Sequence, residues 1–181
     1  MREGGLARLV AAAALCVALA APPAHAQVSA DDVADAFVEA VALCARAKLA
    51  GGGIADLAQA ENRVAAAGED ARAFLRAPEG RPIWDVLAAR GIVLISEPDE
   101  SRCEVTAYGP RVRPVFDRVA AELTGGNLEF TETEVPQDPS AIVRDFNRTN
   151  PNVNVRLDGG EPGMPGRTFR FPMLLAFVRA Q

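Results

Sequence analysis

Histidine, cysteine, tryptophan and tyrosine are scarce in this 181-residue chain, which has one, three, one and one of them, respectively. The single histidine is His25, in an N-terminal segment that we expect to be removed. Without imidazole, the remaining chain cannot perform Ser-His-Asp or Cys-His catalysis, and it cannot form the zinc sites that depend on histidine. We therefore expect no transition-metal centre, no cofactor and no catalytic site of these types.

The first 26 residues have the three-part order of a secretory signal peptide. Arg2 and Arg8 precede an apolar run at 9–21, and a proline pair then leads into an Ala-His-Ala motif at 24–26. The run is shorter than the roughly 20 residues that a permanent membrane-spanning helix needs, so we interpret it as a cleavable targeting signal and not as a membrane anchor. We expect cleavage after Ala26, which leaves a single exported domain at 27–181, periplasmic or secreted.

The expected mature chain is acidic. It has 17 basic and 23 acidic side chains, which give a formal net charge of −6. Nucleic acids and anionic membranes are bound by basic surfaces, so this balance argues against both as main partners. A length of 155 residues is enough to build one hydrophobic core without a metal or many crosslinks.

The cysteines predict one disulfide bond. Cys16 lies within the expected signal peptide, so Cys44 and Cys103 remain after cleavage. In an oxidising compartment, two cysteines without a C-x-x-C motif are most simply interpreted as a structural bridge. A bridge that closes about 60 residues would stabilise the fold by about 4 kcal/mol in the chain-entropy model.

The N-terminal half of the mature chain is predicted to be helical. A capping-box pattern at 29–32 opens a helix that runs to about Ala50. Its apolar residues recur on one helical face, at Val33, Phe37, Val41 and Cys44. Three glycines at 51–53 predict a turn into an antiparallel, alanine-rich helical return over 54–67. Pro82 favours a further helix that Gly91 ends.

The C-terminal half is predicted to contain most of the strands. Residues 92–95 and 103–107 predict a hairpin, and Pro114 favours a helix that ends at a glycine pair, 125–126. Further strands are predicted at 127–135, 153–157 and 168–179, whereas 141–148 fits a helical turn or a strand. The sum is an α+β fold in which a helical N-terminal half packs on an antiparallel sheet of about five strands, crossed by one helix.

Carboxylate pairs are the remaining route to catalysis, because two acids with separated pKa values can hydrolyse glycosides. The candidate acids are Asp99 and Glu100, Asp158 and Glu161, and Glu129, Glu132 and Glu134. Acidic residues are also expected in solvent-exposed turns and on the solvent-exposed face of a strand, so these positions could equally be structural. Lys48 is the one possible base for a serine-lysine pair, but a solvated lysine is expected at the end of a helix from the helix dipole alone.

Three side chains are candidates for contact with a partner, namely Met164, Trp84 and Tyr108. Met164 lies in the glycine- and proline-rich segment 159–166, which must leave the sheet and would expose an adaptable methionine. Trp84 fits either a core anchor or an interface hot spot.

These patterns favour an exported protein that acts by binding, either as an envelope accessory factor or as an inhibitor-like partner protein. Its partner would be an envelope protein or polymer that the sequence does not identify. Two alternatives stay open: a carboxylate-dependent hydrolase that acts on an envelope polymer, and a carrier of a small apolar ligand. The carrier would use the apolar C-terminal run, in which Phe169, Phe171 and Phe177 are otherwise plain core residues.

Overall fold

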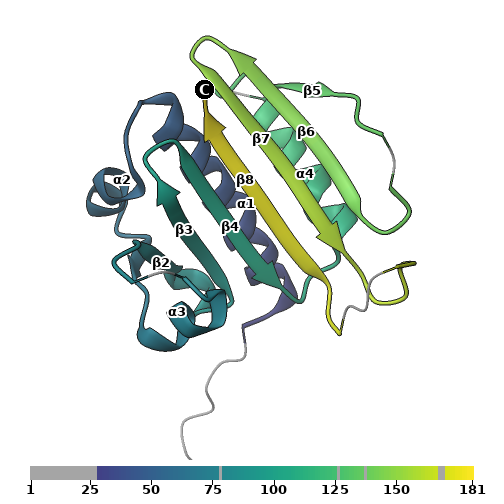
Figure 1. Ribbon diagram of the computed structural model, residues 1–181, viewed down its shortest axis with the longest axis horizontal. Coiled ribbons are helices and arrows are strands. Elements are labelled where there is room, and N and C mark those ends of the chain that lie inside the picture. The colour runs from purple at the N-terminus through teal and green to yellow at the C-terminus, as the bar shows by residue number, and fades with distance from the viewer. Residues whose placement is uncertain (1–27, 78, 126, 137, 167–169) are drawn as a thin grey trace, which may run out of the picture.

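One antiparallel sheet of eight strands forms the centre of the molecule, in the order β1-β2-β3-β4-β8-β7-β6-β5 (Figure 1). The computed structural model describes residues 28–77, 79–125, 127–136, 138–166 and 170–181. The strands are β1 (Val64–Ala66), β2 (Ile83–Val86), β3 (Val93–Asp99), β4 (Arg102–Tyr108), β5 (Thr131–Thr133), β6 (Ile142–Thr149), β7 (Asn152–Gly160) and β8 (Met173–Ala180). The helices are α1 (Ala30–Leu49), α2 (Ile54–Glu61), α3 (Glu69–Leu75) and α4 (Val112–Thr124), with a 3-10 turn at Leu87–Ala89. The expected signal peptide lies outside the described residues.

The order of elements repeats along the chain. In each half a long helix precedes four strands in an antiparallel meander: α1 precedes β1 to β4, with α2 and α3 inserted, and α4 precedes β5 to β8. The fourth strands of the two halves, β4 and β8, pair antiparallel along their whole lengths. The sheet is therefore continuous, and each half extends outward from this central pair to a three-residue edge strand.

Helix α1 is buried on more than one side. Its N-cap is Ser29, whose Oγ accepts a hydrogen bond from the backbone N–H of Asp32 at 3.1 Å, while the Asp32 carboxylate accepts one from the backbone N–H of Ser29 at 3.0 Å. This confirms the predicted capping box. The helix packs on the sheet and on α4, and Figure 1 shows both helices behind the sheet. An apolar surface on several sides, supplied largely by alanine, suits that central position.

A disulfide joins α1 to the sheet. Cys44 of α1 and Cys103 of β4 are bonded, with their Cα atoms 5.8 Å apart, and both residues are fully buried. The predicted bridge is confirmed. It links the first helix to the strand that lies beside the middle of the sheet.

Helix α4 approaches β7 unusually closely. A Cβ atom built on Gly159 would lie 2.5 Å from Val112 Cγ1, which is closer than real Cβ atoms approach, and 3.0 Å from Phe116 Cζ, which is tighter than most real contacts. Phe116 in turn stacks on Phe37 of α1 with ring centroids 6.4 Å apart. Glycine at position 159 therefore sets the spacing between this helix and the sheet.

The fold class is α+β with one antiparallel sheet, but the prediction of about five strands and a helical N-terminal half is wrong in detail. The helix predicted from Pro82 is replaced by β2 and a 3-10 turn. Ile83 and Trp84 pair with successive residues of β3 and therefore point to opposite faces. Pairing with β3 outweighs the helix-like spacing of the apolar residues, because that spacing covers barely two turns.

Two other boundaries differ from the predictions, and one open alternative is decided. The alanine-rich return is helical only to Glu61, and Val64–Ala66 form the edge strand β1. The ambiguous segment 141–148 is strand β6. The strand predicted at 127–135 shortens to Thr131–Thr133, because Leu128 and Phe130 turn into the core before it begins.

The two faces of the sheet differ in what covers them. α1 and α4 pack on one face, where Cys103, Val105 and Ala107 of β4 are fully buried. On the other face, α3 lies over part of the first half, where Phe74 meets Tyr108 of β4 edge to face at 5.4 Å. We call the side of β4, β8, β7 and β6 that points away from α1 and α4 the open face; in Figure 1 it is turned toward the viewer.

Candidate functional site

Strand β8 breaks the usual pattern of a sheet with one solvated face. Such strands alternate apolar residues toward the core with polar residues toward water. β7 follows this rule, since Asn152, Asn154, Arg156 and Asp158 alternate with its buried residues. In β8 the core-facing residues are Leu174, Ala176 and Val178, whereas the outward positions also carry apolar side chains, namely Met173, Leu175 and Phe177. We call these three residues the β8 stripe.

Further apolar side chains lie at the Met173 end of the stripe. Met173 pairs with Tyr108 of β4, against which Phe74 of α3 packs. Phe74 is 58% exposed, and Phe171, two residues before β8, is 64% exposed. Exposed aromatic residues of this kind gathered beside a methionine are typical of protein-binding surfaces.

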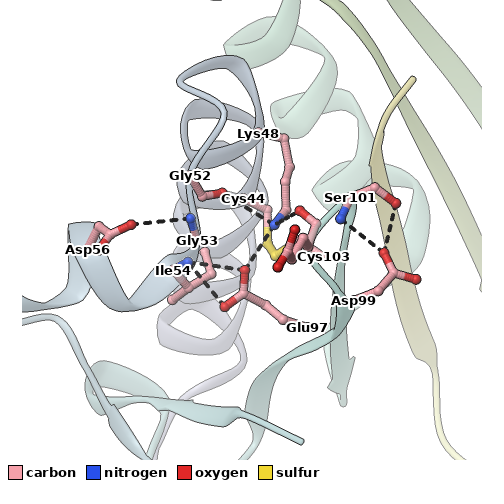
Figure 2. A network of polar contacts seen from close by, with 11 residues as sticks. Cys44, Lys48, Gly52, Gly53, Ile54, Asp56, Glu97, Asp99, Ser101 and Cys103 are labelled. Carbon is pink, nitrogen blue, oxygen red and sulfur yellow. Dashed lines mark hydrogen bonds and ion pairs between the residues drawn. A yellow bond between two sulfur atoms is a disulfide. The ribbon is translucent and has the colours of Figure 1, made fainter.

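A polar cluster in the first half holds α1 and α2 against the β3–β4 hairpin (Figure 2). The Lys48 side chain is 1% exposed and Glu97, its ion-pair partner at 3.0 Å, is 11% exposed. Lys48 Nζ also donates to the carbonyl oxygens of Glu100 at 2.9 Å and Gly52 at 3.4 Å. The Glu97 carboxylate accepts the backbone N–H of Ile54, the first residue of α2, at 3.1 Å.

The prediction that Lys48 is solvated is therefore wrong. Its position is explained by the helix: Lys48 follows the buried Cys44 by four residues and so continues the same buried stripe. A cleft of about 570 Å³ lies beside this ion pair. All three N–H donors of the ammonium are already engaged, which leaves Lys48 with a structural role and not with that of a catalytic base.

Two of the candidate carboxylates of the loops hold local structure. Asp99 accepts hydrogen bonds from Ser101 and from Arg102, which together lower the Asp99 pKa to about 2. Glu100 is exposed at the tip of the same hairpin. Glu161 Oε1 accepts the backbone N–H of Val112 at 2.8 Å and so binds the first turn of α4.

The remaining acids lie at other places. Asp158 is on the open face, opposite Leu175. Glu132 accepts two hydrogen bonds of 2.7 Å from Arg144, which lower the Glu132 pKa and raise that of Arg144. Glu129 lies 3.6 Å from Arg148, and Glu134 is exposed. Glu132 and Glu129 are thus engaged with arginines.

The three candidate contact residues lie apart from one another. Tyr108 is on the open face beside Met173. Trp84 packs against the main core, where its Nε1 atom is buried and has no hydrogen-bond partner among the described residues. Met164 is half-buried, and its sulfur accepts the backbone N–H of Glu161 at 3.2 Å. Tyr108 is thus the one that adjoins the β8 stripe.

The phenylalanines of the carrier hypothesis are not arranged as the lining of a ligand cavity would be. Phe177 belongs to the β8 stripe, and Phe171 is largely exposed. Phe169 lies outside the described residues. The β8 stripe itself was missed because its alternation with buried residues is hidden in a continuous apolar run, which predicts a strand buried on both faces.

Neither a metal site, nor a membrane-spanning helix, nor a known relative assigns a function to the described part of the chain. Within the described ranges, no group of three or more His, Cys, Asp or Glu side chains is placed to hold a metal ion. The helices described here include none that is long and apolar enough to cross a membrane. Comparisons with protein-family models, curated proteins and solved structures find no match for this chain.

Proposed function

We propose that this chain is an exported protein that acts by binding a protein partner through its open face. The observation that carries the proposal is the β8 stripe: three successive outward positions on a central strand are apolar, on a face where neighbouring strands are polar. The three side chains are half-buried and point away from the main core, so part of their apolar surface stays in contact with water. Their natural role is contact with another surface.

The chemistry of the other clusters supports binding over turnover. The buried ion pair of Lys48 and Glu97 is fully engaged in backbone contacts, and the loop carboxylates bind local donors. The polar groups described so far thus stabilise the scaffold. The apolar side chains of the β8 stripe, in contrast, take no part in these polar contacts.

Site-specific photo-crosslinking in the producing cell tests this proposal. A photoreactive residue at Leu175 or Phe177 should give one reproducible protein adduct, whereas the same residue at Glu122, on the exposed side of α4, should give none. The purified adduct partner should then bind the unmodified chain. It should bind the double variant Leu175→Thr, Phe177→Thr at least about tenfold more weakly, at an unchanged melting temperature.

Leu87→Thr serves as a matched control, because Leu87 is 46% exposed but lies in the 3-10 turn after β2. This variant should bind normally. Equal binding by the double variant and the unmodified chain would overturn the proposal.

Export is the second part of the proposal and rests on the N-terminal sequence. The mature protein from the periplasm or medium should have a mass that begins at Gln27, as measured by intact mass spectrometry. A full-length cytoplasmic product would contradict this part and leave the binding surface unaffected.

A further inference from the structure

The β8 stripe ends in a hollow that is rich in arginine. This hollow of about 240 Å³ is lined by side chains from β4, β7 and β8, among them Arg102, Arg156, Arg179 and Phe177. Phe177 lies between Glu104 of β4 and Arg156 of β7 in the sheet register. We call this site the arginine hollow. It adjoins the apolar stripe and lies on the same face.

The register places two of the arginines directly opposite each other. Arg102 of β4 pairs with Arg179 of β8, so two positive charges face each other across neighbouring strands. Like charges directly opposite each other destabilise a sheet, and the Asp99 carboxylate, which binds Arg102 at 2.6 Å, offsets only the charge of Arg102. In a chain whose net charge is negative, this concentration of positive charge is local.

Each guanidinium retains hydrogen-bond donors for a ligand. Arg102 uses its Nε atom to bind Asp99 at 2.6 Å, and Arg156 contacts Asp145 through Nη1 at 3.4 Å. Arg179 is exposed and forms no ion pair with any described residue. A guanidinium has five N–H donors, so most donors of the three groups remain available.

Glu104 is the one acidic side chain in the lining, and it lies on the side of Phe177 opposite Arg156. The hollow thus presents an apolar ring with guanidinium groups along one side and one end. Guanidinium forks match carboxylates in bidentate geometry, and an aromatic floor accepts an apolar side chain. A ligand that uses both must carry the two kinds of group close together.

We infer that the open face binds an acidic peptide segment, whose apolar side chains lie along the β8 stripe and whose carboxylates enter the arginine hollow. This inference rests on the proposed function, because it assumes that the open face is the binding surface. The juxtaposition of stripe and hollow favours a peptide over a purely anionic polymer, which would leave the stripe uncovered.

Selection from a display library of short random peptides tests the inference directly, with the mature, disulfide-bonded protein as target. Enriched peptides should combine leucine or aromatic residues with nearby aspartate or glutamate. A synthetic copy of the best peptide should bind at least about tenfold more tightly than its amide copy, in which each acid is replaced by Asn or Gln.

Protein variants then locate the contact. The triple variant Arg102→Gln, Arg156→Gln, Arg179→Gln should bind the acidic peptide at least about tenfold more weakly. Arg111→Gln is the matched control for charge, since Arg111 is exposed at the start of α4 and outside the hollow, and it should bind normally. Raising the salt should weaken binding to the unmodified protein more than to the triple variant.

Failure of the peptide inference can be distinguished from failure of the proposed function. Neutral or basic peptides that bind through Leu175 and Phe177 would overturn the acidic segment but support the open face as a binding surface. Inorganic polyphosphate that competes for the arginine hollow as tightly as the peptide would identify a general anion site and overturn the peptide assignment. Failure to enrich any peptide would overturn the inference, while the crosslinks at Leu175 would still decide the proposed function.

Discussion

The two halves of the molecule follow one order of elements but are stabilised by different means. In the first half, β1 and β2 have three and four residues, and α3 and a 3-10 turn interrupt the meander. In the second half, β6, β7 and β8 have eight or nine residues and pair along nearly their whole lengths. Strand pairing therefore supplies more of the order in the second half.

The first half compensates with links between its helices and its hairpin. The disulfide ties α1 to β4, and the Lys48–Glu97 pair ties the end of α1 and the start of α2 to β3. The second half has a tight helix-to-sheet contact at Gly159 and a peripheral arginine network instead. The comparison teaches that a repeated topology does not require a repeated set of stabilising interactions.

Removal of the disulfide should have the largest effect. The variant Cys44→Ala, Cys103→Ala should lose about 4 kcal/mol of unfolding free energy, because the unfolded chain regains the freedom of a loop of about 60 residues. Urea denaturation followed by circular dichroism measures this loss. A change below about 1 kcal/mol would show that the first half does not depend on its crosslink.

Loss of the buried cation should come next. Lys48→Met should cost about 3 kcal/mol, because it leaves the Glu97 carboxylate buried without its partner. The double variant Lys48→Met, Glu97→Leu should be less destabilised than Lys48→Met alone, since both desolvated charges are then removed. A double variant that loses the sum of the two single effects would contradict a coupled pair. The same denaturation assay applies.

In the second half, the close contact of α4 with β7 should be sensitive to a single methyl group. Gly159→Ala should cost about 2 kcal/mol, because the added Cβ atom overlaps Val112 and Phe116 in a packed core. Gly68→Ala is the control, since its Cβ atom would meet nothing within 4 Å, and it should change stability by less than about 1 kcal/mol. Thermal melts of the three proteins would compare them.

The arginine network of the second half should contribute less. Arg144 contacts Glu132 and Asp117, but its side chain is 22% exposed and both acids are more exposed still. Arg144→Met should therefore cost only about 1 kcal/mol. High salt should reduce the difference between the unmodified protein and this variant, whereas the effect of Lys48→Met should persist in salt.

Acid should reveal the smallest contribution, at the tip of the β3–β4 hairpin. The Asp99 pKa is about 2 in the folded protein, below the value of about 4 in an unfolded chain, so ionised Asp99 stabilises the fold above pH 4. This contribution is lost as the pH falls from about 4 to about 2. The stabilities of the unmodified protein and Asp99→Asn should converge over that range in urea titrations.

Local signals predicted the long elements well. The capping box at Ser29 and the apolar stripe through Cys44 specify α1 within a few residues, because cap and periodicity agree. Alternation around Cys103 likewise predicted β4, and the inward positions of both cysteines led to the disulfide. The two elements, α1 and β4, depend mainly on residues that are near in sequence.

The features that were missed depend on distant partners. β2 forms because its backbone pairs with that of β3. Lys48 is buried because its ammonium forms an ion pair with Glu97, which lies 49 residues away in the sequence. The open face could not be predicted either, because the orientation of β8 depends on which side α1 and α4 cover. One local signal for the burial of Lys48 was present in the sequence. The buried apolar stripe of α1 runs through Cys44, and its next position, four residues on, is Lys48.

The central position of β8 determines when the sheet can be completed. β8 comes after every other strand in the chain, yet it pairs with both β4 and β7. During synthesis the two meanders can form only as separate, open-edged pieces until residues 173–180 have emerged. Completion then joins residues about 70 positions apart across β4 and β8, which gives the fold a high contact order and slow final closure. A chain built in this way remains incompletely folded until its last strand is available.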